Sequence, residues 1–303
     1  MLLQIKHNGQ LCNRLFSLLP TMAYAIHNKI KLFVLLQDRK YLDYFPNIYN
    51  NHWVRFLLSK DADDHTKPYR MTRWISKNPK KNIGAKIERV LLRMADKPKY
   101  AVNGDLTETK RLKGICCIDG WEHRSDLSFI NEERAKLLDL FMPREDIISH
   151  VDEYFSNYDG VTVGVHIRRG DYKEHLDGRY FFDDETYLSV IQDIKNQIIK
   201  IGINNVRFLI CSNEPFIMRN DVANMFQIEP LFSSDCMTDL YGLSRCDYII
   251  GPPSTFSQWA SFMGNTPLNV FFKKGDVVKL SEFSPIVSLD RFANNTGYYD
   301  RME

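Results

Sequence analysis

The second half of the chain alternates short apolar runs with helical segments, and this alternation constrains the fold more than any other feature. The run 161–167 is rich in β-branched residues and nearly free of charge, which is typical of a strand buried in a parallel sheet. Further strands are predicted at 206–211, 246–250 and 267–272, and helices at 184–200, 214–220, 237–245 and 254–263. Strands that alternate with helices predict a doubly wound α/β domain.

The N-terminal half opens with the same kind of pattern. A strand is predicted at 2–6, a helix at 11–28 and a second strand at 30–36, which together indicate a βαβ unit. An amphipathic helix with a basic outer face is predicted at 84–95. The polar stretch 156–160 marks a domain boundary near residue 155, so we expect one domain over 1–155 and another over 156–303.

Charge is segregated along the 303 residues. The chain has 40 basic and 38 acidic residues, and a net charge of +2 argues against a strongly basic nucleic-acid binder. The segment 65–100 nevertheless holds eleven basic and two acidic residues, a net charge of +9, which leaves −7 on the rest of the chain. A solvated basic face and contact with an anionic membrane are both compatible with this segment.

Targeting signals and disulfide patterns are not evident. No run approaches the ~18 apolar residues of a membrane span, and no basic and apolar leader opens the sequence. The six cysteines form no C-x-x-C pair, and most lie in apolar runs, which favours buried reduced thiols. We therefore expect a cytoplasmic protein.

The densest polar motif reads H-I-R-R-G-D-Y over residues 166–172 and directly follows the predicted strand 161–167. Ligands of open α/β sheets bind beyond the carboxyl ends of such strands. Arg168 and Arg169 could offer planar, bidentate donors to a diphosphate. A solvated loop with surface arginines is the alternative interpretation.

A second motif, 251–257, follows the strand 246–250 and opens a helix. Backbone N–H groups at a helix N-terminus, with the hydroxyls of Ser254 and Thr255, could cradle phosphate without a metal. Ordinary capping by Ser254 is the alternative, since serine is favoured at that position. Combined with the arginine motif, this segment predicts the opposite wall of one nucleotide site.

Metal ligands are weakly represented. Asp61 and Asp63 have the D-x-D spacing that can hold a divalent ion on a sugar nucleotide, but they lie in a polar, irregular stretch. The eight histidines show no zinc-binding spacing, and no G-x-S-x-G motif supports a serine hydrolase. We expect no bound metal.

At these residues the chain resembles the α-1,2-fucosyltransferases, within a superfamily that also includes α-1,6- and protein O-fucosyltransferases. Segment 166–172 is similar to the H-x-R-R-G-D-Y signature, 239–260 to the D-L-x…N-S-T-F-S-W-W-A block, and 9–15 to the G-G-L-G-N-Q/R-L turn. The resemblance spans essentially the whole chain and is weakest at 40–115. Departures include Cys12 for a glycine, Arg14 for the more frequent glutamine, 212–214 for Ser-Asp-Asp, and prolines at 252–253.

The resemblance implies a GT-B-like α/β fold of two Rossmann-like domains, with the donor GDP-β-L-fucose in the cleft between them. The domain 1–155 would face the acceptor, and 156–303 would bind the GDP-sugar. The reaction implied is an inverting, metal-independent transfer of L-fucose to a galactose-terminated glycan. The expected linkage is α-1,2, to galactose O2.

The resemblance also implies a role for individual site residues. Arg168 would contact the β-phosphate and offset the charge on the departing GDP. His166 and Asp239 would face the guanosine, and Ser254 and Thr255 would hold phosphate oxygens. Arg169 and Phe256 would complete the donor site. Asn13 would reach the reaction centre from the first domain. Asp171, Glu174, His175 and Asp177 are all candidates for the general base. The alternative is a transition state that needs little base assistance.

Alternative functions remain compatible with the sequence. The same cradle could serve another nucleotide sugar or another fucosyl linkage. A nucleotide- or glycan-binding protein without turnover is the non-enzyme alternative. The acceptor depends on 40–115, where the pattern is poorest, and the +9 segment 65–100 could draw the enzyme to anionic lipid that carries glycan acceptors.

Overall fold

The computed structural model describes part of the chain as two compact units. The described residues are 2–4, 10–37, 39–58, 100–102, 105–106, 116–118, 124–125, 127–214, 220–230 and 235–286. One unit runs to Arg144 and the second begins at Glu145. The D-x-D aspartates, the basic segment up to residue 99 and the predicted helix 84–95 lie outside the described residues.

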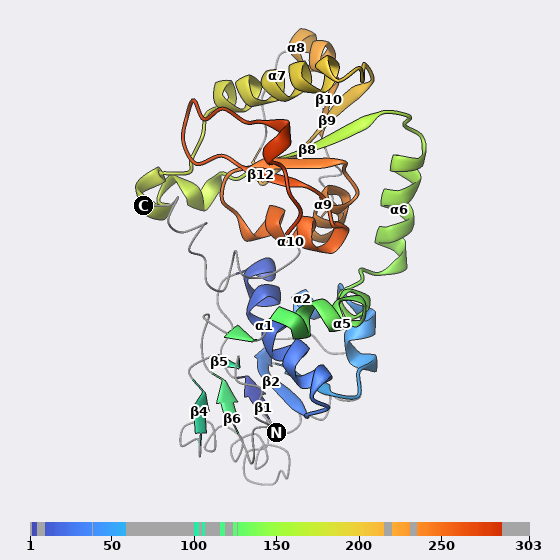
Figure 1. Cartoon of the computed structure of the whole chain (residues 1–303), viewed down its shortest axis with the longest axis vertical. Coiled ribbons are helices and arrows are strands. Elements are labelled where there is room, and N and C mark those ends of the chain that lie inside the picture. Colours follow the sequence, from blue (N-terminus) through green and yellow to red (C-terminus); the bar gives the residue numbers. More distant parts are fainter. Residues whose placement is uncertain are drawn as a thin grey trace. The chain divides into compact units, whose positions relative to one another are not determined.

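The first unit is built on a parallel sheet of five strands in the order β3-β2-β1-β6-β4. These strands are β1 (Leu2–Gln4), β2 (Leu32–Gln37), β3 (Val54–Leu58), β4 (Tyr100–Val102) and β6 (Cys116–Ile118). Helix α1 (Leu11–His27) packs against α5 (Leu127–Leu140) (Figure 1). The shorter elements of this unit are α2 (Arg39–Leu42), η1 (Pro46–Asn50), β5 (Asp105–Leu106) and β7 (Arg124–Ser125).

The second unit holds another five-stranded parallel sheet, in the order β10-β9-β8-β11-β12. Its strands are β8 (Val161–Ile167), β9 (Val206–Ser212), β10 (Ile228–Pro230), β11 (Tyr248–Gly251) and β12 (Leu268–Val270). Its helices are α6 (Glu145–Ser156), α7 (Asp184–Lys200), α8 (Asn220–Phe226), α9 (Cys236–Ser244) and α10 (Thr255–Gly264), with short turns η2 (Gly170–Lys173), η3 (His175–Gly178) and η4 (Leu280–Glu282).

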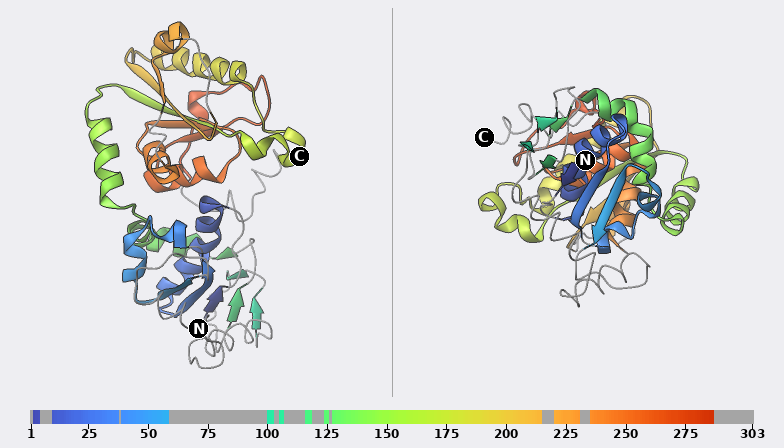
Figure 2. Two further views of the ribbon diagram at one scale, coloured as in Figure 1. Left: turned by 180° about the vertical axis from the view of Figure 1, so that it is seen from behind. Right: turned by 90° about the horizontal axis from the view of Figure 1, so that it is seen from below.

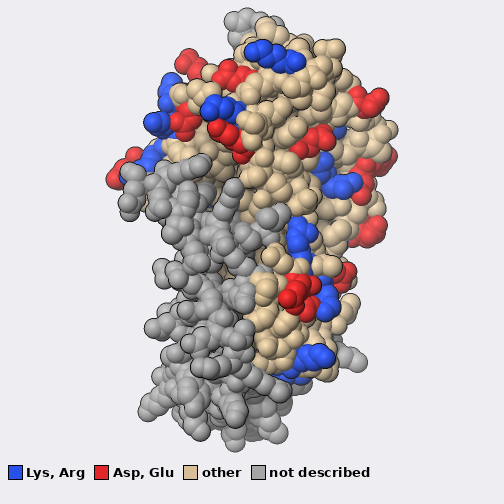
Figure 3. All heavy atoms as spheres, viewed as in Figure 1, with Lys and Arg blue, Asp and Glu red and all other residues tan. Residues whose placement is uncertain are grey.

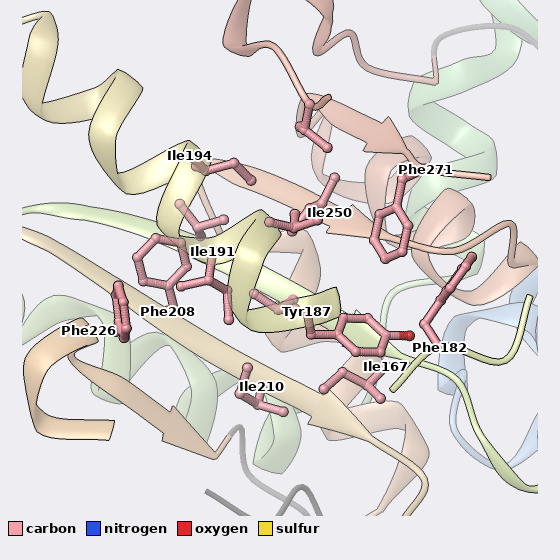
Figure 4. Close-up of a cluster of buried hydrophobic side chains, with 14 of the residues drawn as sticks. Ile167, Phe182, Tyr187, Ile191, Ile194, Phe208, Ile210, Phe226, Ile250 and Phe271 are labelled. Atoms are coloured by element: carbon pink, nitrogen blue, oxygen red, sulfur yellow. The ribbon is translucent and has the colours of Figure 1, made fainter. Parts of the chain in front are cut away.

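Helices cover both faces of this second sheet. Helices α7 and α8 lie on one face, and α9 and α10 on the other, as both the front and the back views show (Figures 1 and 2). The core between the sheet and α7 contains the side chains of Ile167, Tyr187, Ile191 and Phe208, which are all fully buried (Figure 4). Burial of such large apolar side chains is the main stabilising contribution to this layer.

Most elements expected from the sequence are confirmed within about two residues. The strand at 161–167 and the helix at 184–200 have the expected bounds, and Asp183 caps that helix by accepting a hydrogen bond from the backbone N–H of Thr186 at 2.9 Å. The helix expected at 214–220 differs: residues 215–219 lie outside the described residues, and helix α8 begins only at Asn220. Helices α5 and α6 and the edge strand β10 were not expected.

The boundary between the units lies earlier than expected. Residue 155 falls inside helix α6, which packs against α9 and therefore belongs to the second unit. The boundary is at 144/145, before this helix, because the amphipathic face of α6 buries Ile147 and Val151 there.

The described cysteines differ in burial. Cys12, Cys211 and Cys246 are buried, as expected, but Cys236 is exposed at the start of α9, so the expectation of burial is wrong there. Among the residues that the structure describes, no helix is long and apolar enough to span a membrane.

Candidate functional site

The centre of the candidate site is the point where strand order reverses in the second sheet. Strand β8 lies between β9 and β11, so the chain after β8 and the chain after β11 leave neighbouring strand ends. A Cβ atom on Gly251 would lie only 2.7 Å from the carbonyl oxygen of His166. The two strand ends therefore approach closely at the switch point, where doubly wound sheets bind ligands.

The loop after β8 holds Arg168 by two contacts. Its Nη2 lies 2.8 Å from a carboxylate oxygen of Asp171, and its guanidinium carbon lies 5.5 Å from the centre of the Tyr172 ring. The side chain of Arg168 is 19% exposed, whereas that of Asp171 is 58% exposed. Arg168 is thus a partly accessible cation directly beyond the buried strand, as the sequence indicates.

Arg169 occupies a different environment from its neighbour. Its guanidinium pairs with Asp184, in the first turn of α7, and its side chain is only 13% exposed. Its backbone N–H donates to Oδ1 of Asn213 at 2.8 Å. Arg169 therefore anchors the loop to α7 and to the end of β9, and its contacts do not support the expectation that both guanidiniums face one diphosphate.

Asn213 was not among the residues expected in the site. It follows β9, whose last residues pair with those of β8, and its side chain lies beside the arginine loop. Gly170 permits this contact, because its φ is +61° and a Cβ there would lie 2.9 Å from Nδ2 of Asn213. The sequence signal was the polar run 212–214 directly after a buried strand.

The loop after β11 ends at the N-terminus of α10, which Ser254 caps. Oγ of Ser254 accepts a hydrogen bond from the backbone N–H of Phe256 at 3.2 Å. Thr255 is the first residue of the helix, and the first turn contains no acidic side chain. Such a helix start favours an anion through its backbone N–H groups and its dipole.

Tyr172 connects the two loops. Its hydroxyl donates to the carbonyl oxygen of Pro253, the residue directly before Ser254, at 2.6 Å. Burial raises the pKa of the Tyr172 hydroxyl, so it stays protonated as a donor. The arginine motif and the helix N-terminus, expected as opposite walls of one site, are therefore joined in the structure.

His166 lies beneath these loops as a neutral imidazole. It is buried in β8, and burial, together with the charge of Arg168, lowers its pKa to about 3. Its ring lies 5.2 Å from that of Phe256, tilted by 31°. Nδ1 is buried and has no hydrogen-bond partner among the described residues, so a neutral ring here could still bond a ligand.

The remaining expected residues lie on other elements. Asp239 is half-buried in the first turn of α9, a helix capped by Asp235. In a right-handed crossover from β10 to β11, α9 starts at the carboxyl edge of the sheet, the same edge as the two loops. Asn13 is half-buried in the first turn of α1, in the first unit, so its part in a shared site stays a prediction.

The candidate bases after the arginine motif are accessible. Glu174, His175 and Asp177 are exposed, and the ring of His175 lies 5.3 Å from that of Tyr172. Among the described residues, no group of three or more His, Cys, Asp or Glu side chains is arranged to hold a metal ion. Asp61 and Asp63 lie outside that part of the chain.

The fold is similar to that of solved fucosyltransferases. The α-1,6-fucosyltransferase NodZ of Bradyrhizobium, soaked with GDP-fucose, is 15% identical, with 93% of this chain and 96% of that chain covered and a TM-score of 0.51. Arabidopsis thaliana FUT1 with GDP is 13% identical, with 95% and 74% covered and a TM-score of 0.53. POFUT1 with GDP-fucose is 12% identical, with 90% and 97% covered and a TM-score of 0.51. The expected GT-B-like α/β class is confirmed.

The sequence match is concentrated in the second unit. Residues 144–272 match the model of a family described as Glycosyl transferase family 11. This range contains β8, β11 and both loops at the switch point, so the resemblance expected from the motifs is confirmed there. Sequence comparison with curated proteins gives no significant match.

Proposed function

We propose that this protein is an inverting fucosyltransferase that transfers L-fucose from GDP-β-L-fucose to a glycan hydroxyl without a bound metal. The observation that carries the proposal is that Tyr172 links Arg168 to the N-terminus of α10. Its ring contacts Arg168, its hydroxyl bonds Pro253, and the two segments follow neighbouring strands. A cation and a row of backbone N–H groups at one switch point suit a diphosphate. The family match of 144–272 and the GDP or GDP-fucose in the similar structures support this donor.

Departure of GDP is the step that these residues would assist. As the bond from fucose C1 to the β-phosphate oxygen breaks, the electron pair moves to the phosphate and its negative charge grows. Arg168, already held beside the ring of Tyr172, would offset that charge, and the first turn of α10 would stabilise the same anion. Preorganised donors of this kind lower the barrier because they need no reorientation during the reaction.

Recognition of guanine would come from His166 and Asp239. The neutral ring of His166 retains an unpaired Nδ1, and a carboxylate at Asp239 could accept from the guanine N–H groups. Phe256, whose ring lies 5.2 Å from that of His166, would supply apolar surface to the nucleoside. Thermal-shift comparison of GDP, UDP and CMP tests this assignment, and a preference for UDP would contradict it.

The acceptor in this proposal is a galactose-terminated glycan, and the linkage is α-1,2 to O2. The H-x-R-R-G-D-Y signature at 166–172 supports this linkage over the α-1,6 linkage named for NodZ. Asn13 would approach the reaction centre from the first unit. Asp171, which pairs with Arg168 at 2.8 Å, is a candidate general base. Attack by the deprotonated hydroxyl opposite the departing GDP would invert C1.

The decisive experiment measures GDP release from GDP-β-L-fucose with a panel of galactosides. We expect turnover with one or more of them, unchanged in EDTA, and an α-fucosyl-(1→2)-galactose linkage by NMR of the product. Loss of turnover in EDTA would contradict the metal-independent mechanism, and a 1→6 product would correct the linkage. Donor binding without transfer to any acceptor, and without donor hydrolysis, would favour a binding protein.

Arg168→Ala tests the role of the central cation. We expect turnover to fall by on the order of 10²-fold or more, because a preorganised charge at the leaving group is lost. Arg245→Ala is the matched control, since Arg245 also pairs with a single aspartate, Asp152 at 2.9 Å, but at the far end of α9. Equal activity of the two variants would contradict the assignment of Arg168 to the leaving group.

A membrane role for the basic segment 65–100 completes the proposal. We expect a cytoplasmic enzyme that contacts the inner face of the membrane, where lipid-linked glycan acceptors would be presented. On the visible face of the described second unit, Lys and Arg are interspersed with Asp and Glu, so the segregated charge of the sequence is not repeated there (Figure 3). Co-sedimentation with vesicles is expected only with anionic lipid, and equal pelleting with neutral vesicles would retire the idea.

A further inference from the structure

The side chain of Tyr172 joins the arginine loop to the loop after β11. Its hydroxyl donates to the carbonyl oxygen of Pro253, 81 residues away in sequence, at 2.6 Å. Pro253 directly precedes Ser254, whose Oγ caps α10. One hydroxyl therefore holds the residue directly before the helix cap.

The other side of Tyr172 contacts the cation of the site. The guanidinium carbon of Arg168 lies 5.5 Å from the centre of the tyrosine ring, within the range of a cation–π interaction. Asp171, the preceding residue, pairs with the same guanidinium at 2.8 Å. Arg168 is thus held by its own loop, and that loop is held to α10 through the tyrosine hydroxyl.

We infer that Tyr172 is a positioning residue that sets the separation between Arg168 and the N-terminus of α10, so that both engage the two phosphates of a nucleoside diphosphate. This inference rests on the proposed function, because it assumes a diphosphate ligand. It extends that function by assigning preference for a diphosphate over a monophosphate to one hydroxyl. A monophosphate needs only one of the two anion-binding groups, so its affinity does not depend on their separation.

Tyr180 provides a matched control in the same region. Its ring is almost completely buried, yet its hydroxyl has no hydrogen-bond partner among the described residues. Phenylalanine at 180 therefore removes an oxygen that holds nothing, whereas phenylalanine at 172 removes the connection between the loops. Both substitutions keep the ring, and Tyr172→Phe also keeps the surface that contacts Arg168.

The test compares the affinities of GDP and GMP by calorimetry in the wild type, Tyr172→Phe and Tyr180→Phe. We expect Tyr172→Phe to raise the Kd of GDP by about tenfold, because a buried hydrogen bond is lost, and to leave the Kd of GMP unchanged. Tyr180→Phe should change neither value. Equal weakening of GDP and GMP, or an unchanged Kd of GDP, would overturn the inference, since general damage to the site affects both nucleotides.

A second measurement needs no ligand and separates the inference from the proposed function. Hydrogen exchange of the backbone amides in 168–172 should be faster in Tyr172→Phe than in the wild type and in Tyr180→Phe. Unchanged exchange would overturn the connection itself. If the wild type binds no GDP but the exchange differs as expected, the proposed function fails while the mechanical role of Tyr172 stands.

Discussion

The carboxylate of Asp171 lies 2.8 Å from Nη2 of Arg168, so the cation assigned to the donor phosphate has an anionic partner before any donor binds. A phosphate that approaches Arg168 must compete with this carboxylate. Asp171 is also the candidate general base. The ion pair therefore gives one residue two separable roles, in competing with a phosphate for Arg168 and in accepting a proton.

Asp171→Asn separates these roles. We expect the Kd of GDP to fall by about fivefold, because a surface ion pair of modest strength no longer competes for Arg168. We also expect turnover to fall, because an amide cannot accept the proton of the acceptor hydroxyl. Calorimetry with GDP and steady-state kinetics measure the two effects separately. Full turnover with tighter GDP binding would remove Asp171 from the list of bases.

Arg169 should contribute to stability more than to leaving-group chemistry. Arg169→Ala leaves the partner carboxylate of Asp184 without its cation, and we expect a loss of about 1–3 kcal/mol in the free energy of unfolding. Denaturant unfolding measures this loss. Lys274→Ala is the control, because Lys274 pairs with Asp183, the exposed cap residue of α7, and this loss should leave the midpoint unchanged. Equal midpoints for both variants would contradict the anchoring role.

The buried His166 should make the protein sensitive to acid. Its pKa is lowered to about 3, whereas an unfolded chain has the ordinary value near 6.5. Between these values the unfolded state binds the proton and the native state does not, so stability should fall as the pH decreases from about 6.5 toward 3. Thermal melts of His166→Gln should show a weaker dependence on pH in this window. His150→Gln, an exposed site on α6, should melt with the dependence of the wild type.

Gly251 should tolerate no side chain. In Gly251→Ala the new Cβ would lie 2.7 Å from the carbonyl oxygen of His166, a buried backbone atom that cannot move without shifting β8. We expect a loss of several kcal/mol in unfolding free energy and weaker GDP binding. The comparison is Gly202→Ala, where backbone strain is present at φ +92° but no atom lies within 4 Å of the added methyl. A smaller loss at 251 than at 202 would refute the close approach.

Local pattern was sufficient for most of the second unit. The apolar run of β8 and the periodicity of α7 are readable because burial of one element face depends on side chains at regular spacing. Asp183 and Ser254 were readable as caps for a similarly local reason, since a cap bonds a backbone N–H only two or three residues away. The position of Arg168 beyond β8 followed from the strand itself.

Contacts between distant segments could not be predicted from the sequence pattern. Arg168 and Arg169 are adjacent and chemically identical, yet one pairs with Asp171 and the other with Asp184. Successive residues of an extended chain point to opposite sides, so the two guanidiniums separate as soon as the loop leaves the strand. Which of them remains available for a ligand depends on the position of helix α7, which no local pattern specifies.

The sequence by itself determined the strand-and-helix series of the second unit, the polar motifs at the carboxyl ends of β8 and β11, and the family resemblance that these motifs carry. Only the tertiary structure decided that β8 and β11 are neighbours, that Tyr172 donates to Pro253, and that Arg169 pairs with Asp184 of α7. The physical reason is the distance along the chain over which each interaction acts. Apolar periodicity and capping act over a few residues, whereas strand order and the contacts across it depend on how separate segments bury their apolar faces together.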